Sequence, residues 1–270
     1  MKRLFFGLVA MVVVLFARAD GVAVRRDAAA IIKRTVERAR ELAEDPNEKV
    51  YRYDKRTMVE SLNGKGEVAK RKFKRYEVTM KGGVPDSRLV AIEGRSLSPK
   101  QIAKEDEKLK RRKRSFMKSD KGGKELTPRT FVPEDLTHRY DVTYLREEKV
   151  DGRSMHVVSY TPKQSSPPAR NLVERVANEL SGTMWIDVED CELARIEVRL
   201  VERVKLWGGF LGALDEFTYS LERARSPESV WYNDVANVGV NARGLFKRLR
   251  FRMVEKTSNF RRATAPLPDE

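Results

Sequence analysis

Apolar residues recur at helical spacing in only a few segments of this chain, and at every second position almost everywhere else. The first helical segment predicts an amphipathic helix over residues 28–44, which begins after Asp27 and ends before Pro46. Its apolar face consists of Ala28, Ile32, Val36, Ala39 and Ala43. A stretch at 170–180 has similar spacing and predicts a second, shorter helix.

From residue 50 onward the period changes to two, which is typical of half-buried strands. Turn signals separate the alternating runs at 63–66, 81–86, 150–153, 189–192 and 241–244. The pattern predicts about nine to eleven mostly antiparallel strands, each with one apolar and one charged face.

A basic helix is predicted to interrupt the strands near 98–118. Ser98, Pro99 and Gln101 form a helix start with a capping box. The same segment contains five consecutive basic residues, Lys110, Arg111, Arg112, Lys113 and Arg114. These residues form either a solvated helix face or a contact with an anionic membrane surface or an acidic partner, where each charge would contribute ~1 kcal/mol.

The predicted fold class is mainly antiparallel β with helices (α+β). A sheet with one apolar face must bury that face, and few helices are available to cover it. We therefore expect an open half-barrel β-sheet wrapped over the N-terminal helix or around a cavity. The 270 residues suit a single domain over 20–262, with a flexible tail at 263–270.

The first 19 residues have the features of a cleavable signal peptide. Lys2 and Arg3 precede an uncharged apolar run from 4 to 17, and small residues at 17 and 19 flank Arg18. The alternative is a short membrane anchor, but a helix of this run is about 21 Å long and a hydrocarbon core is ~30 Å thick. The sequence therefore predicts export, with a periplasmic location in a Gram-negative envelope.

Export changes what the net charge of +15 indicates. Cleavage would remove three basic residues and no acidic one, which leaves +12. Nucleic acid is then excluded as a partner, and anionic headgroups or acidic polymers take its place. The alternative is that the charge serves solubility alone.

No residue pattern indicates catalysis, a metal site or a cofactor. Cys191 is the single cysteine, which excludes an internal disulfide framework, and His138 and His156 lack metal-ligand spacing. No nucleophile elbow, phosphate-binding loop or dinucleotide fingerprint occurs. A hydrolase with paired carboxylates is the remaining enzymatic alternative, although no acidic pair is singled out.

The apolar strand positions are the candidates for a lipid-binding cavity, since acyl chains prefer apolar walls. The alternative is ordinary core packing. A glycine-containing segment at 206–214 is either a flap at the mouth of that cavity or a strand and turn. The cavity candidates are Tyr51, Tyr53, Tyr76, Val78, Tyr140, Tyr144, Ile186, Ile196, Val198, Phe217, Tyr219, Phe251 and Met253.

Two adjacent strands carry a family resemblance. Residues 182–187 have the sequence Gly-Thr-Met-Trp-Ile-Asp, and after a turn residues 193–197 have Leu-Ala-Arg-Ile-Glu. This pair resembles the corresponding strands of LolA/LolB-like proteins, the periplasmic lipoprotein carriers and their outer-membrane receptors. The sharpest match is at Trp185, Ile186 and Asp187.

The resemblance implies a half-barrel with a hydrophobic cavity that carries an acyl lipid or a lipidated protein toward the outer membrane without covalent chemistry. Two alternatives stay open beside this carrier. One is an envelope interaction or sensor module on the same fold that uses the basic helix, and the other is the hydrolase.

Overall fold

A computed structural model of the chain describes residues 27–43, 49–81, 84–119, 136–165, 168–169, 171–206, 212–244 and 247–263. The predicted signal peptide at 1–19 and all but the first residue of the predicted tail at 263–270 lie outside these ranges. Among the helices in the described ranges, none combines the length and the apolar character needed to cross a membrane.

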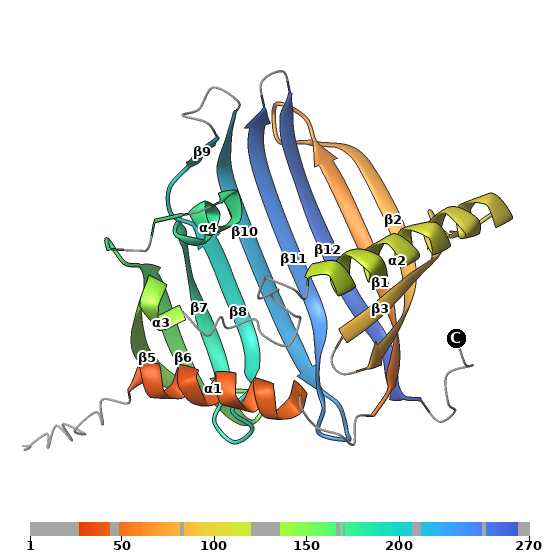
Figure 1. Cartoon of the computed structure of the whole chain (residues 1–270). Coiled ribbons are helices and arrows are strands. Elements are labelled where there is room, and N and C mark those ends of the chain that lie inside the picture. The colour runs from red at the N-terminus through yellow and green to blue at the C-terminus, as the bar shows by residue number, and fades with distance from the viewer. Residues whose placement is uncertain are drawn as a thin grey trace, which may run out of the picture.

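One wide antiparallel sheet dominates the structure (Figure 1). Its strands follow the order β4-β3-β2-β1-β12-β11-β10-β8-β7-β6-β5, and β9 pairs with β10 beside this path. The strands are β1 (Tyr51–Leu62), β2 (Val68–Lys81), β3 (Val84–Ile92), β4 (Arg95–Ser96), β5 (Tyr140–Val150), β6 (Arg153–Pro162), β7 (Leu180–Asp187), β8 (Leu193–Leu200), β9 (Val204–Leu206), β10 (Gly212–Arg225), β11 (Trp231–Gly244) and β12 (Arg248–Arg262).

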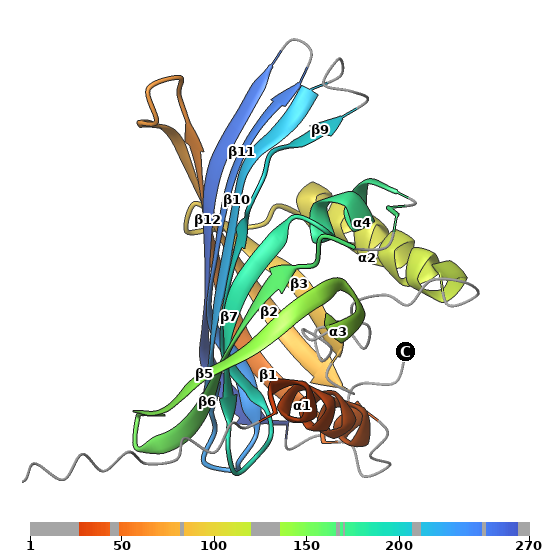
Figure 2. The same ribbon diagram turned by 90° about the vertical axis from the view of Figure 1, so that its left-hand side faces the viewer.

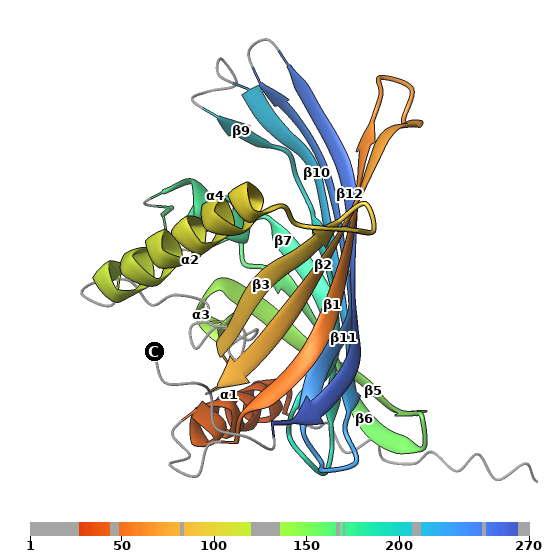
Figure 3. The same ribbon diagram turned by 90° about the vertical axis from the view of Figure 1, so that its right-hand side faces the viewer.

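The sheet is open, because β4 and β5 end its strand order and do not pair with each other. All described helices lie on one side of it, which we call the inner face (Figures 2 and 3). They are α1 (Ala28–Ala43), α2 (Pro99–Ser119), α3 (Leu136–Arg139) and α4 (Leu172–Ala177). The predicted fold class, a mainly antiparallel sheet left open over an N-terminal helix, is therefore confirmed.

The main core lies between α1 and the inner face of β5–β10. Ile32 on α1 is 2% exposed, and Met184 and Leu221 on the sheet are fully buried. The predicted apolar face of α1 thus packs against the sheet through Ala28, Ile32 and Val36. This packing fixes α1 across one end of the strands (Figure 1).

A close approach of two strands in this core requires a glycine. The Tyr160 ring lies over Gly182, its partner across the β6–β7 ladder. A Cβ at 182 would lie 2.1 Å from the Glu197 carbonyl oxygen and 2.6 Å from the Tyr160 hydroxyl oxygen. Burial also raises the pKa of Tyr160 well above its ordinary value.

The three residues of the family resemblance have three different structural roles. Ile186 points into the core under α1. Trp185 points to the opposite, outer face, where its Nε1 donates to Glu148 and the Arg195 guanidinium lies 4.7 Å from its ring. Asp187 is buried at the end of β7, at the turn into β8. The sequence Trp-Ile-Asp therefore fixes both faces of the sheet and one of its turns.

Asp187 organises this turn through four hydrogen bonds. The Arg153 guanidinium donates to both of its carboxylate oxygens at 2.6 and 2.7 Å, and the N–H groups of Glu189 and Asp190 donate to Oδ1 at 3.0 and 2.7 Å. Burial alone would raise the pKa of Asp187, but these donors together hold that pKa below its ordinary value. Cys191 lies in the same turn, and its backbone has a positive φ of 54°.

The predicted boundaries hold for most elements and fail for some. The capping box forms as expected, because Ser98 N donates to Gln101 Oε1 and Gln101 N donates to Ser98 Oγ. The predicted turn at 241–244 is wrong, since these residues continue β11 and pair with β10 and β12. Pro85 and Asp86 likewise belong to β3, and the helix predicted at 170–180 is limited to α4. At 241–244 and at 85–86, pairing with a long neighbouring strand overrides the local turn preference.

We expect Asp187→Asn to lower the free energy of unfolding by roughly 2–3 kcal/mol, because Arg153 loses a charged, buried acceptor. The folded pKa of Asp187 lies below its unfolded value. The loss of unfolding free energy relative to the unmodified chain should therefore be largest above about pH 4 and shrink below it. Urea denaturation at a series of pH values measures this. Glu189→Gln is the control, since that carboxylate also pairs with Arg153 but is 79% exposed. It should cost less than about 1 kcal/mol; equal losses from the two variants would contradict this account.

We expect Gly182→Ala to destabilise the fold by about 1–3 kcal/mol, because the new methyl group collides with backbone and with a buried ring. Thermal unfolding followed by circular dichroism measures the effect. Gly64→Ala is the matched control, since a Cβ there meets nothing within 4 Å. An unchanged melting temperature for Gly182→Ala would show that the Glu197 backbone on β8 and the Tyr160 ring move aside without cost.

Candidate functional site

The predicted cavity residues lie together on the inner face. Tyr140, Ile186 and Ile196 are buried in the core under α1, with Tyr144, Val198 and Tyr219 packed against it. Strand register extends this face, because Tyr219 pairs with Val238 and Val238 with Met253. By the same alternation the face also includes Tyr51, Tyr53, Tyr76, Val78, Phe217 and Phe251. The structure thus brings all thirteen candidates to one face.

Within the described residues, α1 covers one part of this face and leaves another part open. α1 crosses the strand ends of β5–β8, where the core residues are buried (Figure 1). Further along the strands, the apolar residues of β8–β12 are only half-buried. We call this second set the inner floor; it consists of Val198, Phe217, Tyr219, Val238, Val240, Phe251 and Met253.

A small cavity of ≈ 170 Å³ lies between α1 and the sheet. α1 contributes Val36 and Ala39, and β1 contributes Tyr51 and Tyr53. The Phe260 ring stacks on Tyr51 at 5.1 Å between ring centroids. Trp231 and Tyr232 also line this cavity, so four aromatic side chains contribute to its wall.

One polar cluster interrupts the inner face. Glu255 accepts a hydrogen bond from Thr57 Oγ1 at 3.0 Å and pairs with Lys55 Nζ at 3.4 Å. Lys55 also lies over the Tyr76 ring, 5.2 Å from its centroid. Burial, with a smaller contribution from the Glu255 charge, raises the pKa of Tyr219 to about 12. The tyrosine hydroxyl of the inner floor is therefore neutral at any physiological pH.

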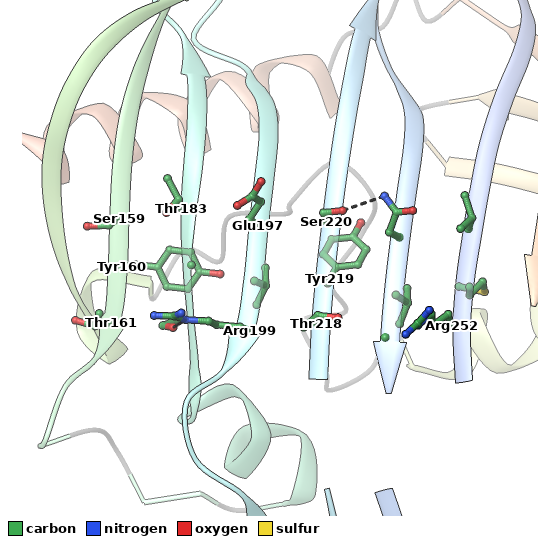
Figure 4. A pocket seen from close by; sticks show the side chains of 18 residues that line it. Ser159, Tyr160, Thr161, Thr183, Glu197, Arg199, Thr218, Tyr219, Ser220 and Arg252 are labelled. Atoms are coloured by element: carbon green, nitrogen blue, oxygen red, sulfur yellow. Dashed lines mark hydrogen bonds between the residues drawn. The ribbon is translucent and has the colours of Figure 1, made fainter. Parts of the chain in front are cut away.

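A groove of ≈ 700 Å³ is lined by residues from β6 to β12 (Figure 4). Two rows of cross-strand neighbours alternate onto the outer face. The row between them, with Val198, Tyr219, Val238 and Met253 of the inner floor, also contributes to the lining, although its side chains alternate inward. One row is Ser181, Arg199, Thr218, Gly239 and Arg252; the other is Ser159, Thr183, Glu197, Ser220, Asn237 and Val254. The groove spans about 24 Å across the strands and about 7 Å between rows.

The sequence analysis did not single out this outer groove. Its signal is a repeat of small hydroxyl residues at the outward positions of β6, β7 and β10. Gly239 deepens it, because a Cβ there would lie 2.5 Å from Thr218 Oγ1. Hydroxyl and amide groups with two arginines and one glutamate suit a polar surface rather than an acyl chain.

The basic helix predicted near 98–118 is α2. It touches the sheet at its edge, where Arg88 on β3 lies 4.0 Å from Asp106. Lys110 and Arg111 are exposed, and Lys110 lies 3.9 Å from Glu107. The side chains of Arg112, Lys113 and Arg114 lie outside the described residues. The anionic contact of this helix stays a prediction.

The glycine-containing segment at 206–214 is described only at its ends. Leu206 ends β9 and pairs with Gly212, the first residue of β10. These ends therefore belong to a strand pair, and residues 207–211 lie outside the described residues.

Among the described side chains, no three His, Cys, Asp or Glu residues gather in a way that could hold a metal ion. Cys191 is a half-buried free thiol in the β7–β8 turn. His156 lies on β6, where its ring packs edge-on against Tyr144 with centroids 5.8 Å apart.

No protein-family model matches the chain, and no curated protein does. Among solved structures, a LolA superfamily protein of Nitrosomonas europaea is 13% identical, with 89% of this chain and 96% of that chain covered and a TM-score of 0.34. A domain assigned to outer membrane lipoprotein sorting in Vibrio parahaemolyticus is 10% identical, with coverages of 89% and 95% and a TM-score of 0.36.

A third match is the MucA/MucB complex of Pseudomonas aeruginosa, at 10% identity, with 87% of this chain and 99% of that chain covered and a TM-score of 0.28. The family that the sequence resembles is thus present among the structural matches. Likenesses with identities and TM-scores this low carry no argument about ligand, partner or location.

Proposed function

We propose that this chain is a non-enzymatic binding protein that holds an acyl chain on the inner floor. The observation that carries the proposal is the half-buried state of this face beyond α1. Seven aromatic and aliphatic residues from four strands lie there side by side, and each is half-buried rather than buried. An acyl chain on such a surface gains ~0.8 kcal/mol for every CH₂ group it buries.

The composition of the two faces supports this choice of site. The inner floor contains Tyr219 as its single hydroxyl residue, whereas the outer groove carries two arginines, a glutamate and several hydroxyl groups. An acyl chain cannot satisfy the polar groups of the outer groove, and covering them would cost desolvation energy. The inner floor imposes little such cost.

The proposal includes the location and the cargo. The apolar run at 4–17 and the small residues at 17 and 19 support export by a signal peptide. In the envelope of a Gram-negative cell, an acyl lipid or a lipidated protein needs a shielded surface to cross the aqueous periplasm. We infer that this chain supplies that surface as a carrier toward the outer membrane.

We expect the affinity for saturated fatty acids to rise about fourfold with each added CH₂ group, until the inner floor is covered, and then to level off. Competition against a polarity-sensitive fluorescent fatty acid measures this on the delipidated chain. Native mass spectrometry supplies the stoichiometry, expected to be one. An affinity that does not depend on chain length would overturn the proposed function.

We expect Val238→Asp to weaken fatty-acid binding at least tenfold, because a charge in the middle of the inner floor must be desolvated when the acyl chain covers it. Asn237→Asp is the matched control, since the neighbouring residue on the same strand points to the outer face and is exposed. It should leave the affinity unchanged. Circular dichroism spectra of both variants confirm that the sheet is intact. Equal losses in the two variants would place the ligand elsewhere.

A further inference from the structure

Three lysines on β2 share the inner face with the proposed acyl site. Thr57 on β1 and Glu255 on β12 face inward, because Glu255 pairs in register with Ala236, which packs against the inner core. Lys74 is the β2 partner of Thr57, and by strand alternation Lys72 and Lys70 lie on the same face. Lys70, Lys72 and Lys74 form what we call the lysine row.

Lys70 and Lys72 each stand at the end of a cross-strand row that runs into the inner floor, and the row of Lys74 runs through Thr57 to Glu255 beside it. Lys72 pairs with Val59 and Val59 with Met253, and the row continues through Val238 to Tyr219. Lys70 pairs with Ser61, which in turn pairs with Phe251. Four strand steps separate Lys72 from Tyr219, which is about 19 Å. Over this distance the inner face changes from apolar at Tyr219 to cationic at Lys72.

The charge of the lysine row is not balanced by its neighbours. Glu255 is the carboxylate on the adjacent inner positions, and it is already occupied by Lys55 and Thr57. Within the described part of the chain, no carboxylate lies within ion-pair distance of Lys70, Lys72 or Lys74. Lys70 and Lys72 are exposed, and Lys74 is half-buried. Three unpaired ammonium groups therefore border the apolar floor.

The outer face of the same strand provides a contrast. There Arg71 is bound by Glu60, with its Nε 2.8 Å from Oε1. The inner lysines lack such a partner among the described residues, although the two sets alternate along one strand. Arg75 on the outer face also lacks a carboxylate partner among the described residues, but the inner lysines are the ones that border the apolar floor.

We propose that the lysine row binds the phosphate headgroup of an anionic phospholipid whose acyl chain lies on the inner floor. This inference rests on the proposed function and specifies its ligand as an anionic amphiphile. Lysine ammonium groups are compact point charges with three donors each, which suits a phosphate oxygen approached from several sides. The lysine row marks the headgroup end, and the core under α1 marks the other end.

The test compares two lysophospholipids with the same acyl chain, one with an anionic phosphatidylglycerol headgroup and one with a zwitterionic phosphatidylcholine headgroup. Both are added as monomers to the delipidated chain, and displacement of a fluorescent fatty acid gives their affinities. We expect the anionic lipid to bind at least tenfold more tightly at low salt, and the difference to shrink as salt screens it. Free glycerol phosphate, which lacks the acyl chain, should not displace the probe at the same concentrations.

The variant K70Q/K72Q/K74Q should remove this preference and leave the affinity for the zwitterionic lipid unchanged. The matched control is R56Q/R75Q/K256Q, which removes three positive charges from an exposed cross-strand row on the outer face of the same sheet region. It should keep the full preference, which separates a local headgroup contact from net charge.

Each of the following results would overturn the headgroup site, and one of them would overturn the proposed function as well. Equal affinity of the unmodified chain for both lipids would overturn the headgroup site while leaving the proposed function in place. No binding of either lipid or of the fatty-acid probe would overturn both. Displacement by glycerol phosphate alone would show a free phosphate site in place of a lipid site, and loss of preference in the control variant would show a general charge effect.

Discussion

The structure depends on one constraint, which is that the inner face of a twelve-stranded open sheet is much wider than α1, the described helix that packs on its main core. α1 is 16 residues long and buries the sheet across one end only. Closing the sheet into a barrel would remove the problem, but β4 and β5 remain apart. The apolar positions beyond α1 are left half-buried, and a continuous apolar face of this kind is typical of an interaction site.

The two parts of the inner face therefore contribute differently. Under α1, side chains such as Met184 and Leu221 are fully buried, so their packing stabilises the fold. Beyond α1, Tyr219 and Met253 keep exposed surface and can change partners. The same strands supply both parts, so the rigid core positions the proposed binding surface directly. The Asp187 turn adds to this rigidity, because it ties β6, β7 and the β7–β8 connection together through Arg153.

The alternation of apolar and polar residues was enough to predict the fold class, the start of α2 and the single face shared by the cavity candidates. The alternation could not predict strand order. It shows which face of the sheet a residue belongs to, but not which strand lies beside it. The position of the lysine row shows this. Nothing near Lys72 in sequence indicates that Met253 lies two strands away. The outer groove was missed for a similar reason, since Thr183, Ser220 and their neighbours are ordinary outward residues until β7, β8 and β10 are set side by side.

Local turn preference was also an incomplete guide. Residues 241–244 have turn composition but extend β11, because β10 and β12 continue beside them and satisfy their backbone groups. Asp187, by contrast, lies at a turn that the sequence does mark, and the resemblance drew attention to it. Its partner Arg153 is 34 residues away, and only the β6–β7 pairing shows why a buried carboxylate is tolerated there.

The place of β12 in the sheet has a consequence for how the molecule is made. β12 is the last strand in sequence, yet it lies between β1 and β11, and the bond from Lys55 to Glu255 joins residues 200 positions apart. Until β12 has been synthesised, β1 pairs with β2 alone and lacks its second neighbour. During synthesis, β1–β3 must wait as a separate hairpin sheet while β5–β11 assemble. The final strand then joins the two halves, so a chain that is shortened at its C-terminus should lose the junction between them and not merely one edge.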